Sequence, residues 1–135
     1  MVKPLYETKV ISNGGRDGKV FSEDNTFYQD LAVPKEMGGN GVTESNPEQL
    51  FAAGYSACFN NALMHILKSD SKGTIEPEVS VTAYLLPDKN DGGVKLAAEL
   101  DVTLTDMTQE EAETYVEKAH NYCPYSNSLK ESIYI

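Results

Sequence analysis

The chain has 135 residues and a formal net charge of −10, which suits one acidic globular domain covering residues 1–135. Its 40% share of apolar residues argues against disorder and is enough to build a core without a metal or a disulfide. No run of Lys and Arg forms a basic stripe, so nucleic acid and anionic membrane surfaces are excluded as expected partners, because phosphate contacts need clustered cations.

The start of the sequence and its hydropathy predict a cytoplasmic protein. Residues 1–6 lack the apolar core of a signal peptide, and no stretch approaches the ~18 apolar residues of a membrane span. Cytoplasmic thiols are kept reduced by glutathione and thioredoxin. The two cysteines are therefore expected to be catalytic, redox-active or simply buried, and not to form a permanent disulfide.

The first third of the chain predicts a hairpin followed by another extended segment. Residues 4–12 alternate loosely between apolar and polar, residues 13–18 carry a dense Asn and Gly turn signal, and residues 19–21 resume a strand. Residues 26–34 are also predicted to be extended. A loop rich in glycine follows, with Gly38, Gly39 and Gly41.

A long helix is predicted from Pro47 to about Lys68. Asn46 can cap its start, proline suits the first helical position, and Gln49 can complete a capping box. Apolar side chains cover most of the circumference of this helix, which is typical of a buried central helix.

The second half predicts two strands, residues 75–87 and 94–105, joined by a hairpin loop. A capping box at residues 108–111 opens a second helix. A short turn or helix is expected after Cys123, and residues 133–135 are a candidate edge strand. This order of elements predicts an α+β fold. The inner face of the second helix is expected to carry Ala112, Tyr115, Val116 and Ala119.

Cys58 and Cys123 are the candidate reactive residues, although each has a structural interpretation. The position of Cys58 in an apolar helix favours a buried thiol that behaves as a small hydrophobe. Cys123 precedes Pro124 at a predicted helix start, where unpaired N–H groups lower the pKa of a thiol. Its Cys-Pro-Tyr-Ser sequence resembles a glutaredoxin active site, but only 12 residues follow it, which excludes a thioredoxin-like fold.

Arg16 and Glu48 are candidates only in combination with the thiols. Arg16 alone fits a solvated surface turn, and Glu48 alone fits the first turn of a helix. Peroxide reduction by cysteine needs a thiolate, a fixed cation, a carboxylate that holds the cation, and a second thiol. The chain offers these four groups and little else that is reactive. His65 and His120 have no zinc-ligand spacing to any cysteine and receive no role.

Three segments together resemble the organic hydroperoxide resistance proteins of bacteria, which belong to the OsmC-like superfamily. They are residues 14–20 (Gly-Gly-Arg-Asp-Gly-Lys-Val), residues 46–59 (Asn-Pro-Glu-Gln-Leu-Phe-Ala-Ala-Gly-Tyr-Ser-Ala-Cys-Phe) and residues 123–127 (Cys-Pro-Tyr-Ser-Asn). The resemblance extends over nearly the whole chain in the same order. Asn60-Asn61 and the tail after Asn127 depart from the family's usual pattern.

The resemblance implies a role for each of the four candidates. Cys58 is the peroxidatic cysteine and Cys123 the resolving cysteine, Arg16 activates the thiolate and receives the peroxide, and Glu48 orients Arg16. It also implies an OsmC-like fold with antiparallel strands and a buried central helix, in an intertwined homodimer with active sites at the subunit interface. No metal, flavin or haem is expected, and the expected reductant is a dihydrolipoyl group on a lipoylated protein.

The expected reaction is reduction of an organic hydroperoxide to an alcohol. The Cys58 thiolate attacks the distal oxygen and becomes a sulfenic acid, and Cys123 condenses with it to form a disulfide. Aromatic residues on the helix (Phe51, Tyr55 and Phe59), with Phe21 and Met37 nearby, predict a preference for bulky apolar peroxides.

Two alternatives stay open. A related OsmC-type peroxidase could use another reductant or substrate range, and a small lipid-binding protein could carry both cysteines as structural residues.

Helix geometry bears on how the site is built. Glu48 and Cys58 are ten residues apart, so a straight helix separates them by roughly 15 Å along its axis. Either the helix breaks, near Gly54 for example, or a second copy of the chain supplies Arg16 and Glu48. The second arrangement is expected, because a symmetric interface would cover the apolar helix.

Overall fold

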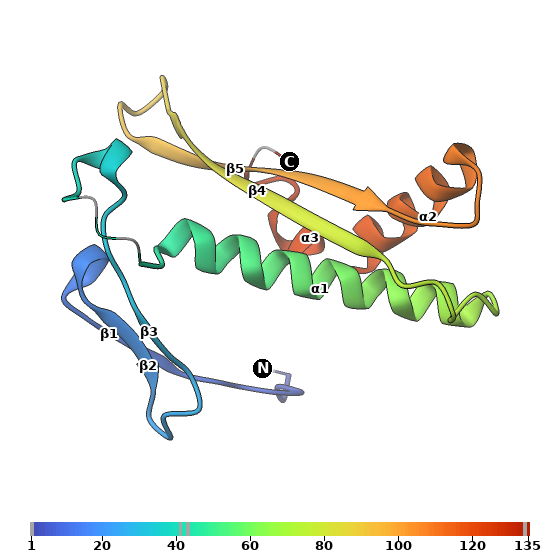
Figure 1. Cartoon of the computed structure of the whole chain (residues 1–135), viewed down its shortest axis with the longest axis horizontal. Helices are drawn as coiled ribbons and strands as arrows, with labels where there is room; N and C mark the ends of the chain where they lie inside the picture. Colours follow the sequence, from blue (N-terminus) through green and yellow to red (C-terminus); the bar gives the residue numbers. More distant parts are fainter. Residues whose placement is uncertain (1, 41, 43, 134) are drawn as a thin grey trace. The chain divides into compact units, whose positions relative to one another are not determined.

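The computed structural model describes residues 2–40, 42, 44–133 and 135. The chain forms two compact units, Met1–Leu50 and Phe51–Ile135, which are described in turn. Figure 1 labels their helices and strands. The fold is α+β with antiparallel strands, as predicted.

The first unit contains a three-stranded antiparallel sheet in the order β1-β2-β3. Its strands are β1 (Val10–Asn13), β2 (Lys19–Ser22) and β3 (Tyr28–Asp30). The predicted hairpin is confirmed, with Asn13 paired to Lys19 across the turn. The turn needs glycine at both ends, because Gly14 has φ 85° and a Cβ on Gly18 would overlap the Asn13 carbonyl.

Two segments of this unit, residues 4–12 and 26–34, were predicted to be extended along their whole length, but each forms only a short strand in the structure. Residues 4–9 are not in a strand, because Val10 already faces Ser22, the last residue of β2, and the chain before it has no partner in this sheet. Of residues 26–34, only β3 is a strand. Leu31 then makes an isolated parallel bridge with Ser45, and a 3₁₀ turn, η2 (Lys35–Met37), follows. Of the predicted glycine loop, Gly41 lies outside the described residues.

The long helix, α1 (Pro47–Ser69), forms close to the predicted bounds. The side-chain Oδ1 of Asn46 accepts a hydrogen bond from the N–H of Gln49 at 2.8 Å, which confirms the predicted cap. Burial around the helix is one-sided within this chain. Ala53 and Ala57 are exposed, and Met64 is 53% exposed, so one face of the predicted buried helix stays uncovered. Its buried residues are Tyr55, Phe59, Ala62, Leu63 and Leu67.

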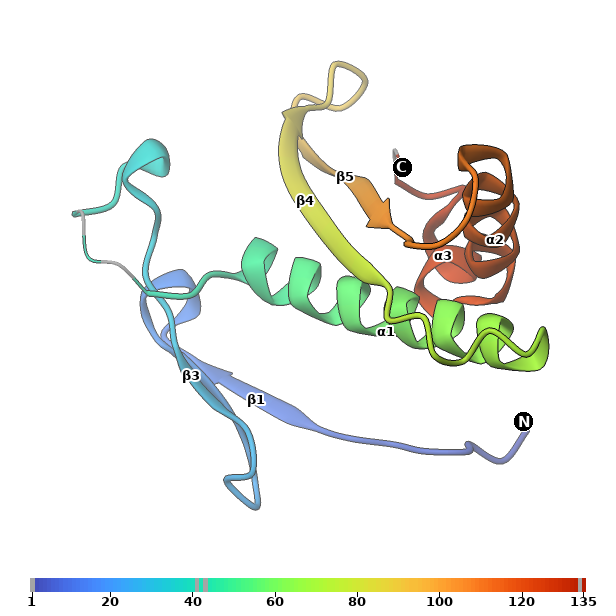
Figure 2. The ribbon, with the colours of Figure 1, turned by 45° about the vertical axis from the view of Figure 1, so that its right-hand side comes forward.

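The second unit packs a hairpin and two helices on α1. The strands β4 (Glu78–Pro87) and β5 (Val94–Thr103) pair antiparallel, with Val81 opposite Leu100, and their alternating apolar residues face the core. Figures 1 and 2 show this hairpin running along α1, with the helices that follow it also beside α1.

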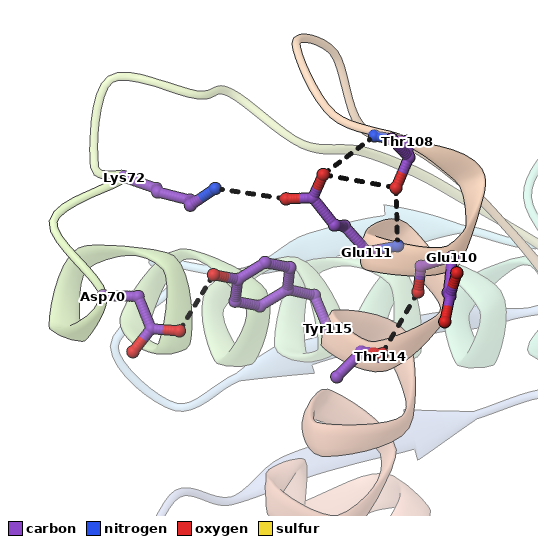
Figure 3. A network of polar contacts seen from close by, with 7 residues as sticks. All are labelled: Asp70, Lys72, Thr108, Glu110, Glu111, Thr114 and Tyr115. Carbon is purple, nitrogen blue, oxygen red and sulfur yellow. Dashed lines mark hydrogen bonds and ion pairs between the residues drawn. The ribbon is translucent and has the colours of Figure 1, made fainter.

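Helix α2 (Gln109–Tyr122) begins with the predicted capping box. Thr108 Oγ1 accepts the N–H of Glu111, and the Glu111 carboxylate accepts the N–H of Thr108 (Figure 3). The predicted inner face is confirmed, with Tyr115 and Ala119 buried and Ala112 and Val116 half-buried.

The chain ends differently from the prediction. A short helix, α3 (Pro124–Leu129), follows Cys123 as expected. The predicted edge strand over residues 133–135 is not formed by its described residues, since Ile133 lies in a bend and Ile135 is in no strand. Tyr134 lies outside the described residues. Across the part of the chain that the structure describes, none of the helices combines the length and apolar character needed to cross a membrane.

Candidate functional site

The two cysteines, 65 positions apart in the sequence, are brought together by packing within the second unit. Cys58 lies on α1 and Cys123 lies at the junction of α2 and α3, and their Sγ atoms are 3.6 Å apart. Both are free thiols. A disulfide has its sulfur atoms about 2.05 Å apart, so a small movement would be enough to form one.

Pro124 explains why Cys123 lies between two helices. The residue before a proline avoids the helical region, and Cys123 has φ −65° and ψ 126°, which ends α2. Proline in turn suits the first position of α3. The N–H of Cys123 donates to the Ala119 carbonyl at 2.8 Å, and its own carbonyl accepts from the Asn127 N–H at 2.9 Å. The backbone of Cys123 is therefore held from both sides.

The two thiols differ in their access to solvent. Cys58 is half-buried, whereas Cys123 has 0% of its surface exposed. A peroxide arriving from solvent can therefore reach Cys58 more easily than Cys123. This asymmetry fits Cys58 as the first residue oxidised and Cys123 as the second.

The pKa of the Cys58 thiol is raised above its ordinary value within this arrangement. Burial is the largest cause, because it disfavours the charged thiolate. The backbone N–H of Tyr125, in the first turn of α3, favours the thiolate and lowers the pKa, while the neighbouring Cys123 raises it. A thiolate at neutral pH therefore needs a further positive charge near Cys58.

Arg16 and Glu48 form a bidentate ion pair in the first unit. The Arg16 Nη1 lies 2.7 Å from Glu48 Oε1, and the Arg16 Nη2 lies 3.0 Å from Glu48 Oε2. The Arg16 side chain is 38% exposed and the Glu48 side chain 18%. The hydrogen bond to Glu48 raises the pKa of Arg16, so the guanidinium stays charged. Glu48 and Arg16 are thus in direct contact, and their catalytic roles stay predictions.

Two hydrogen bonds, one to the Asp17 carboxylate and one between backbone groups, connect the segments that carry this pair. Arg16 lies in η1 (Gly15–Asp17), inside the hairpin turn between β1 and β2. The neighbouring Asp17 accepts the N–H of Val33 at 3.0 Å, and the N–H of Ala32 donates to the Ser45 carbonyl at 3.0 Å. The turn, the segment after β3 and the start of α1 are thus linked, which sets Glu48 opposite Arg16.

The structure therefore assembles the four predicted residues as two pairs, Arg16 with Glu48 and Cys58 with Cys123. One pair belongs to the first unit and the other to the second. A single site that contains all four stays a prediction.

An apolar cavity in the second unit does not include the thiols. Its volume is about 560 Å³, and neither Cys58 nor Cys123 lines it. Tyr55 was expected to line a substrate pocket, but its side chain is fully buried in the core and is not available there. Residues lining the cavity include Leu86, Ala97, Leu100, Val116, His120 and Ile135.

Other polar residues near α1 have structural explanations. The Asn60 side chain donates to the Pro77 carbonyl at 2.9 Å, so it connects α1 to the segment before β4. His65 stacks on Tyr122, with their rings 4.9 Å apart. Within the described residues, no group of three or more His, Cys, Asp or Glu side chains is placed to hold a metal ion.

Sequence reasoning missed one contact beside the thiols. The hydroxyls of Tyr55 and Ser126 bond to each other at 2.7 Å. No local pattern in the sequence could have revealed this contact, because it joins residues 71 positions apart on two packed helices.

Comparisons with known proteins agree with the fold. Residues 38–135 match the family model described as OsmC-like protein. A protein of Staphylococcus saprophyticus named organic hydroperoxide resistance protein-like 2 is 98% identical over 133 residues, which cover 98% of this chain and 94% of that protein. A Staphylococcus aureus protein named organic hydroperoxide resistance protein-like is 41% identical and covers 95% and 90%.

Solved structures give the same result. The organic hydroperoxide resistance protein OhrB of Bacillus subtilis superposes with a TM-score of 0.86 at 38% identity, covering 97% of this chain and 96% of that one. A Vibrio cholerae protein, described as a putative organic hydroperoxide resistance protein with captopril bound in one of the active sites, has a TM-score of 0.87 at 39% identity and covers 97% and 89%. The chain belongs to the organic hydroperoxide resistance family of the OsmC-like superfamily.

Proposed function

We propose that this protein is a cysteine-based peroxidase that reduces organic hydroperoxides to alcohols. The observation that carries the proposal is the pair of free thiols 3.6 Å apart, one half-buried and one fully buried. Family membership points to resistance against organic hydroperoxides, and the thiol pair supplies a chemistry that could provide it.

The proposed reaction has two steps. The Cys58 thiolate attacks the distal oxygen of ROOH, the O–O bond breaks, and the departing alkoxide takes a proton to leave as ROH. Cys58 is then a sulfenic acid. The Cys123 thiolate attacks the Cys58 sulfur, the S–OH bond breaks, and hydroxide takes a proton to leave as water. The product is a Cys58–Cys123 disulfide.

Arg16 has two tasks in this scheme. Its guanidinium offsets the effect of burial on the Cys58 pKa, and it stabilises the negative charge that develops on the departing oxygen. Glu48 holds the planar guanidinium of Arg16 in one orientation through two hydrogen bonds. Neither task requires a bound metal, flavin or haem.

A dithiol must reset the disulfide, and we propose that it is a dihydrolipoyl group on a lipoylated protein in the cytoplasm. The dithiol attacks the disulfide by thiol exchange, both cysteines are reduced, and the lipoyl group becomes a cyclic disulfide. Turnover with the lipoamide system, compared with thioredoxin and glutaredoxin, tests this choice. Equal support by glutaredoxin would contradict it.

The site is proposed to form in a homodimer, with Arg16 and Glu48 supplied by one subunit and the thiols by the other. Helix α1 runs unbroken from Pro47 to Ser69, which removes the alternative of a break at Gly54. The exposed face of α1, with Ala53, Ala57 and Met64, offers an apolar surface for a second copy. The Vibrio cholerae relative, described as having more than one active site, is consistent with this arrangement.

Counting thiols tests the peroxidase itself. Reduced protein is mixed with one equivalent of cumene hydroperoxide, and free thiols are titrated with and without denaturant. Loss of two thiols per chain, with one cumyl alcohol formed, is expected. No loss of thiols would overturn the proposal and would favour a binding protein that uses the apolar cavity.

Mixing two inactive variants tests the shared site. Cys58→Ser subunits and Arg16→Ala subunits are each expected to be almost inactive, and unfolding and refolding them together should produce mixed dimers with one intact site. Recovery of part of the activity is expected. A monomeric protein, or mixed dimers without recovered activity, would show that each chain builds its own site.

A further inference from the structure

A buried hydrogen bond connects the same two helices as the thiol pair. The hydroxyl oxygens of Tyr55 and Ser126 are 2.7 Å apart, and both side chains have 0% exposure. Tyr55 precedes Cys58 by three residues on α1, so the two share a helix face. Ser126 follows Cys123 by three residues in the first turn of α3. The hydroxyl pair therefore joins the same two helix segments as the thiol pair, about one turn away from it.

Close packing around Tyr125 strengthens this junction. A Cβ on Gly54 would lie 2.6 Å from the Tyr125 hydroxyl oxygen, so the Tyr125 side chain occupies this position against α1 because residue 54 is glycine. The Tyr125 and Tyr55 rings are 5.5 Å apart. Glycine is a poor residue for the middle of a helix, and this close approach gives a reason for it.

Disulfide formation makes a specific demand on this junction. The two Sγ atoms must close from 3.6 Å to about 2.05 Å. The backbone of Cys123 is fixed at the end of α2 and the start of α3, so it cannot swing as a free loop would. The distance over which the thiols must close is therefore set by how α3 is held against α1.

We propose that Tyr55 and Ser126 are positioning residues for the resolving step, a role that rests on the proposed peroxidase function. Their hydrogen bond holds the start of α3 so that the Cys123 thiolate stays within reach of the Cys58 sulfenic acid. The bond that forms is Cys58–Cys123, and the Cys58 S–OH bond breaks with release of water. Fast closure protects Cys58, because a second peroxide otherwise oxidises the sulfenic acid to sulfinic acid.

The prediction separates two steps of one reaction. Oxidation of Cys58 by the first peroxide does not involve Cys123, and α3 affects it through the contribution of the Tyr125 backbone to the Cys58 pKa. Tyr55→Phe and Ser126→Ala should therefore slow this first step much less than they slow disulfide formation. Disulfide formation should slow by on the order of tenfold, since small misplacements of reacting groups are costly. The peroxide concentration that converts half of Cys58 to sulfinic acid should fall by a similar factor.

Tyr115→Phe is the matched control. Tyr115 is another largely buried tyrosine of the second unit, and its hydroxyl donates to Asp70 Oδ2 at 2.8 Å (Figure 3). Asp70 lies just past the C-terminal end of α1 and twelve positions (70 − 58) from Cys58 in the sequence. Removing its hydroxyl deletes one long-range hydrogen bond, as Tyr55→Phe does. It should leave both steps and the sulfinic acid threshold unchanged. An equal fall of the sulfinic acid threshold in Tyr115→Phe would mean that loss of any buried tyrosine hydroxyl loosens the packing of the second unit. That result would overturn the proposal.

The experiment uses the full-length protein, rapid mixing with cumene hydroperoxide, and mass spectrometry of quenched samples to count sulfenic acid, disulfide and sulfinic acid. Should Tyr55→Phe fold poorly, Tyr55→Phe/Ser126→Ala removes both partners together and leaves neither hydroxyl unpaired. Wild-type closure rates and thresholds in these variants would overturn the proposal while the peroxidase function stood. Absence of any disulfide in the wild-type protein would instead overturn the function.

Discussion

The two proposed halves of the active site are built in opposite ways. Cys58 and Cys123 lie in a unit with an apolar core, and the backbone of Cys123 is bonded at both ends. Arg16 and Glu48 lie in a unit whose described residues include only two buried side chains, Ser22 and Leu31. The thiols are therefore positioned by packing, whereas the cation is positioned by one ion pair and a few backbone hydrogen bonds.

This difference indicates which of the two units needs a further surface packed against it. A three-stranded sheet requires an apolar face packed against something to be stable on its own. In the first unit, Val10, Phe27 and Tyr28 on or beside the strands are each at least 40% exposed. The first unit is therefore incomplete without a covering surface, which agrees with the proposed homodimer.

The largest expected effect comes from the thiols themselves. Cys58→Ser should lose no thiol and form no alcohol with cumene hydroperoxide, because the residue that meets the peroxide is gone. Cys123→Ser should form one alcohol per chain and then stop, with Cys58 accumulating as sulfenic and then sulfinic acid. Mass spectrometry of both variants after one and ten equivalents of peroxide checks this. Exchange of these two outcomes between the variants would reverse the assigned roles.

The sequence predicted the elements that local signals define. The glycine turn at residues 13–18, the Asn46 cap and the Thr108 capping box each specify a boundary through nearby residues alone, and all three are confirmed. Strand length could not be predicted in this way. Residues 4–9 have a strand-like pattern, but a strand ends where its partner ends.

The site was predicted less directly. The residue types indicated peroxide chemistry, but the pairing of Cys58 with Cys123 and of Arg16 with Glu48 came from the family resemblance, and the structure then brought each pair into contact. The Tyr55–Ser126 bond joins residues 71 positions apart. Contacts of this kind depend on how helices pack, and no local pattern specifies them.

The second prediction concerns the cation. Arg16→Ala should lower the rate of Cys58 oxidation by about 10²–10³-fold, the usual cost of losing a donor to a developing oxyanion. Burial already raises the Cys58 pKa. Without the opposing guanidinium the pKa should rise further, so less thiolate is present at pH 7 and the alkylation profile should move to higher pH. Iodoacetamide rates across pH, with Arg16→Lys as the charge-retaining control, measure both effects.

An unchanged alkylation profile in Arg16→Ala would show that the guanidinium does not act on Cys58. Partial restoration by Arg16→Lys is expected, because lysine keeps the charge but cannot form the bidentate pair with Glu48. Full restoration by lysine would mean that orientation by Glu48 is unimportant. The conclusion that the ion pair with Glu48 positions the Arg16 charge would then be wrong.

The third prediction concerns the substrate. The cavity in the second unit does not include the thiols. In the proposed homodimer, the substrate pocket beside Cys58 is completed by the second subunit and is expected to be apolar. Each buried CH₂ adds about 0.8 kcal/mol to binding, roughly a factor of four. Cumene hydroperoxide should therefore exceed hydrogen peroxide in kcat/KM by on the order of tenfold or more. Steady-state assays with both substrates decide this, and equal values would contradict an apolar pocket.

The smallest expected effect lies at the start of α2, at the opposite end of this helix from Cys123. Thr108→Ala removes the cap and should lower the free energy of unfolding by about 1 kcal/mol, with thiol oxidation unchanged. Thr108→Ser keeps the oxygen that accepts the Glu111 N–H at 3.1 Å and is the matched control.

The loss of unfolding free energy in Thr108→Ala should depend on pH, which provides a second test. The Thr108 N–H lowers the pKa of Glu111, with smaller contributions from the Thr108 hydroxyl and Lys72. A carboxyl whose pKa is lowered by folding stabilises the native state above its unfolded pKa, and the stabilisation disappears as the pH falls through the folded pKa. Alanine keeps the N–H of residue 108, so Thr108→Ala removes only the smaller contribution of the Thr108 hydroxyl to the lowered pKa. The difference between wild type and Thr108→Ala in urea should therefore shrink slightly from pH 7 to about pH 3. A difference that grows in acid would assign the cap's contribution to a group other than Glu111. Slower disulfide formation in Thr108→Ala would show that the thiols depend on the far end of α2, because the packing of the second unit would then transmit a change at Thr108 to Cys123.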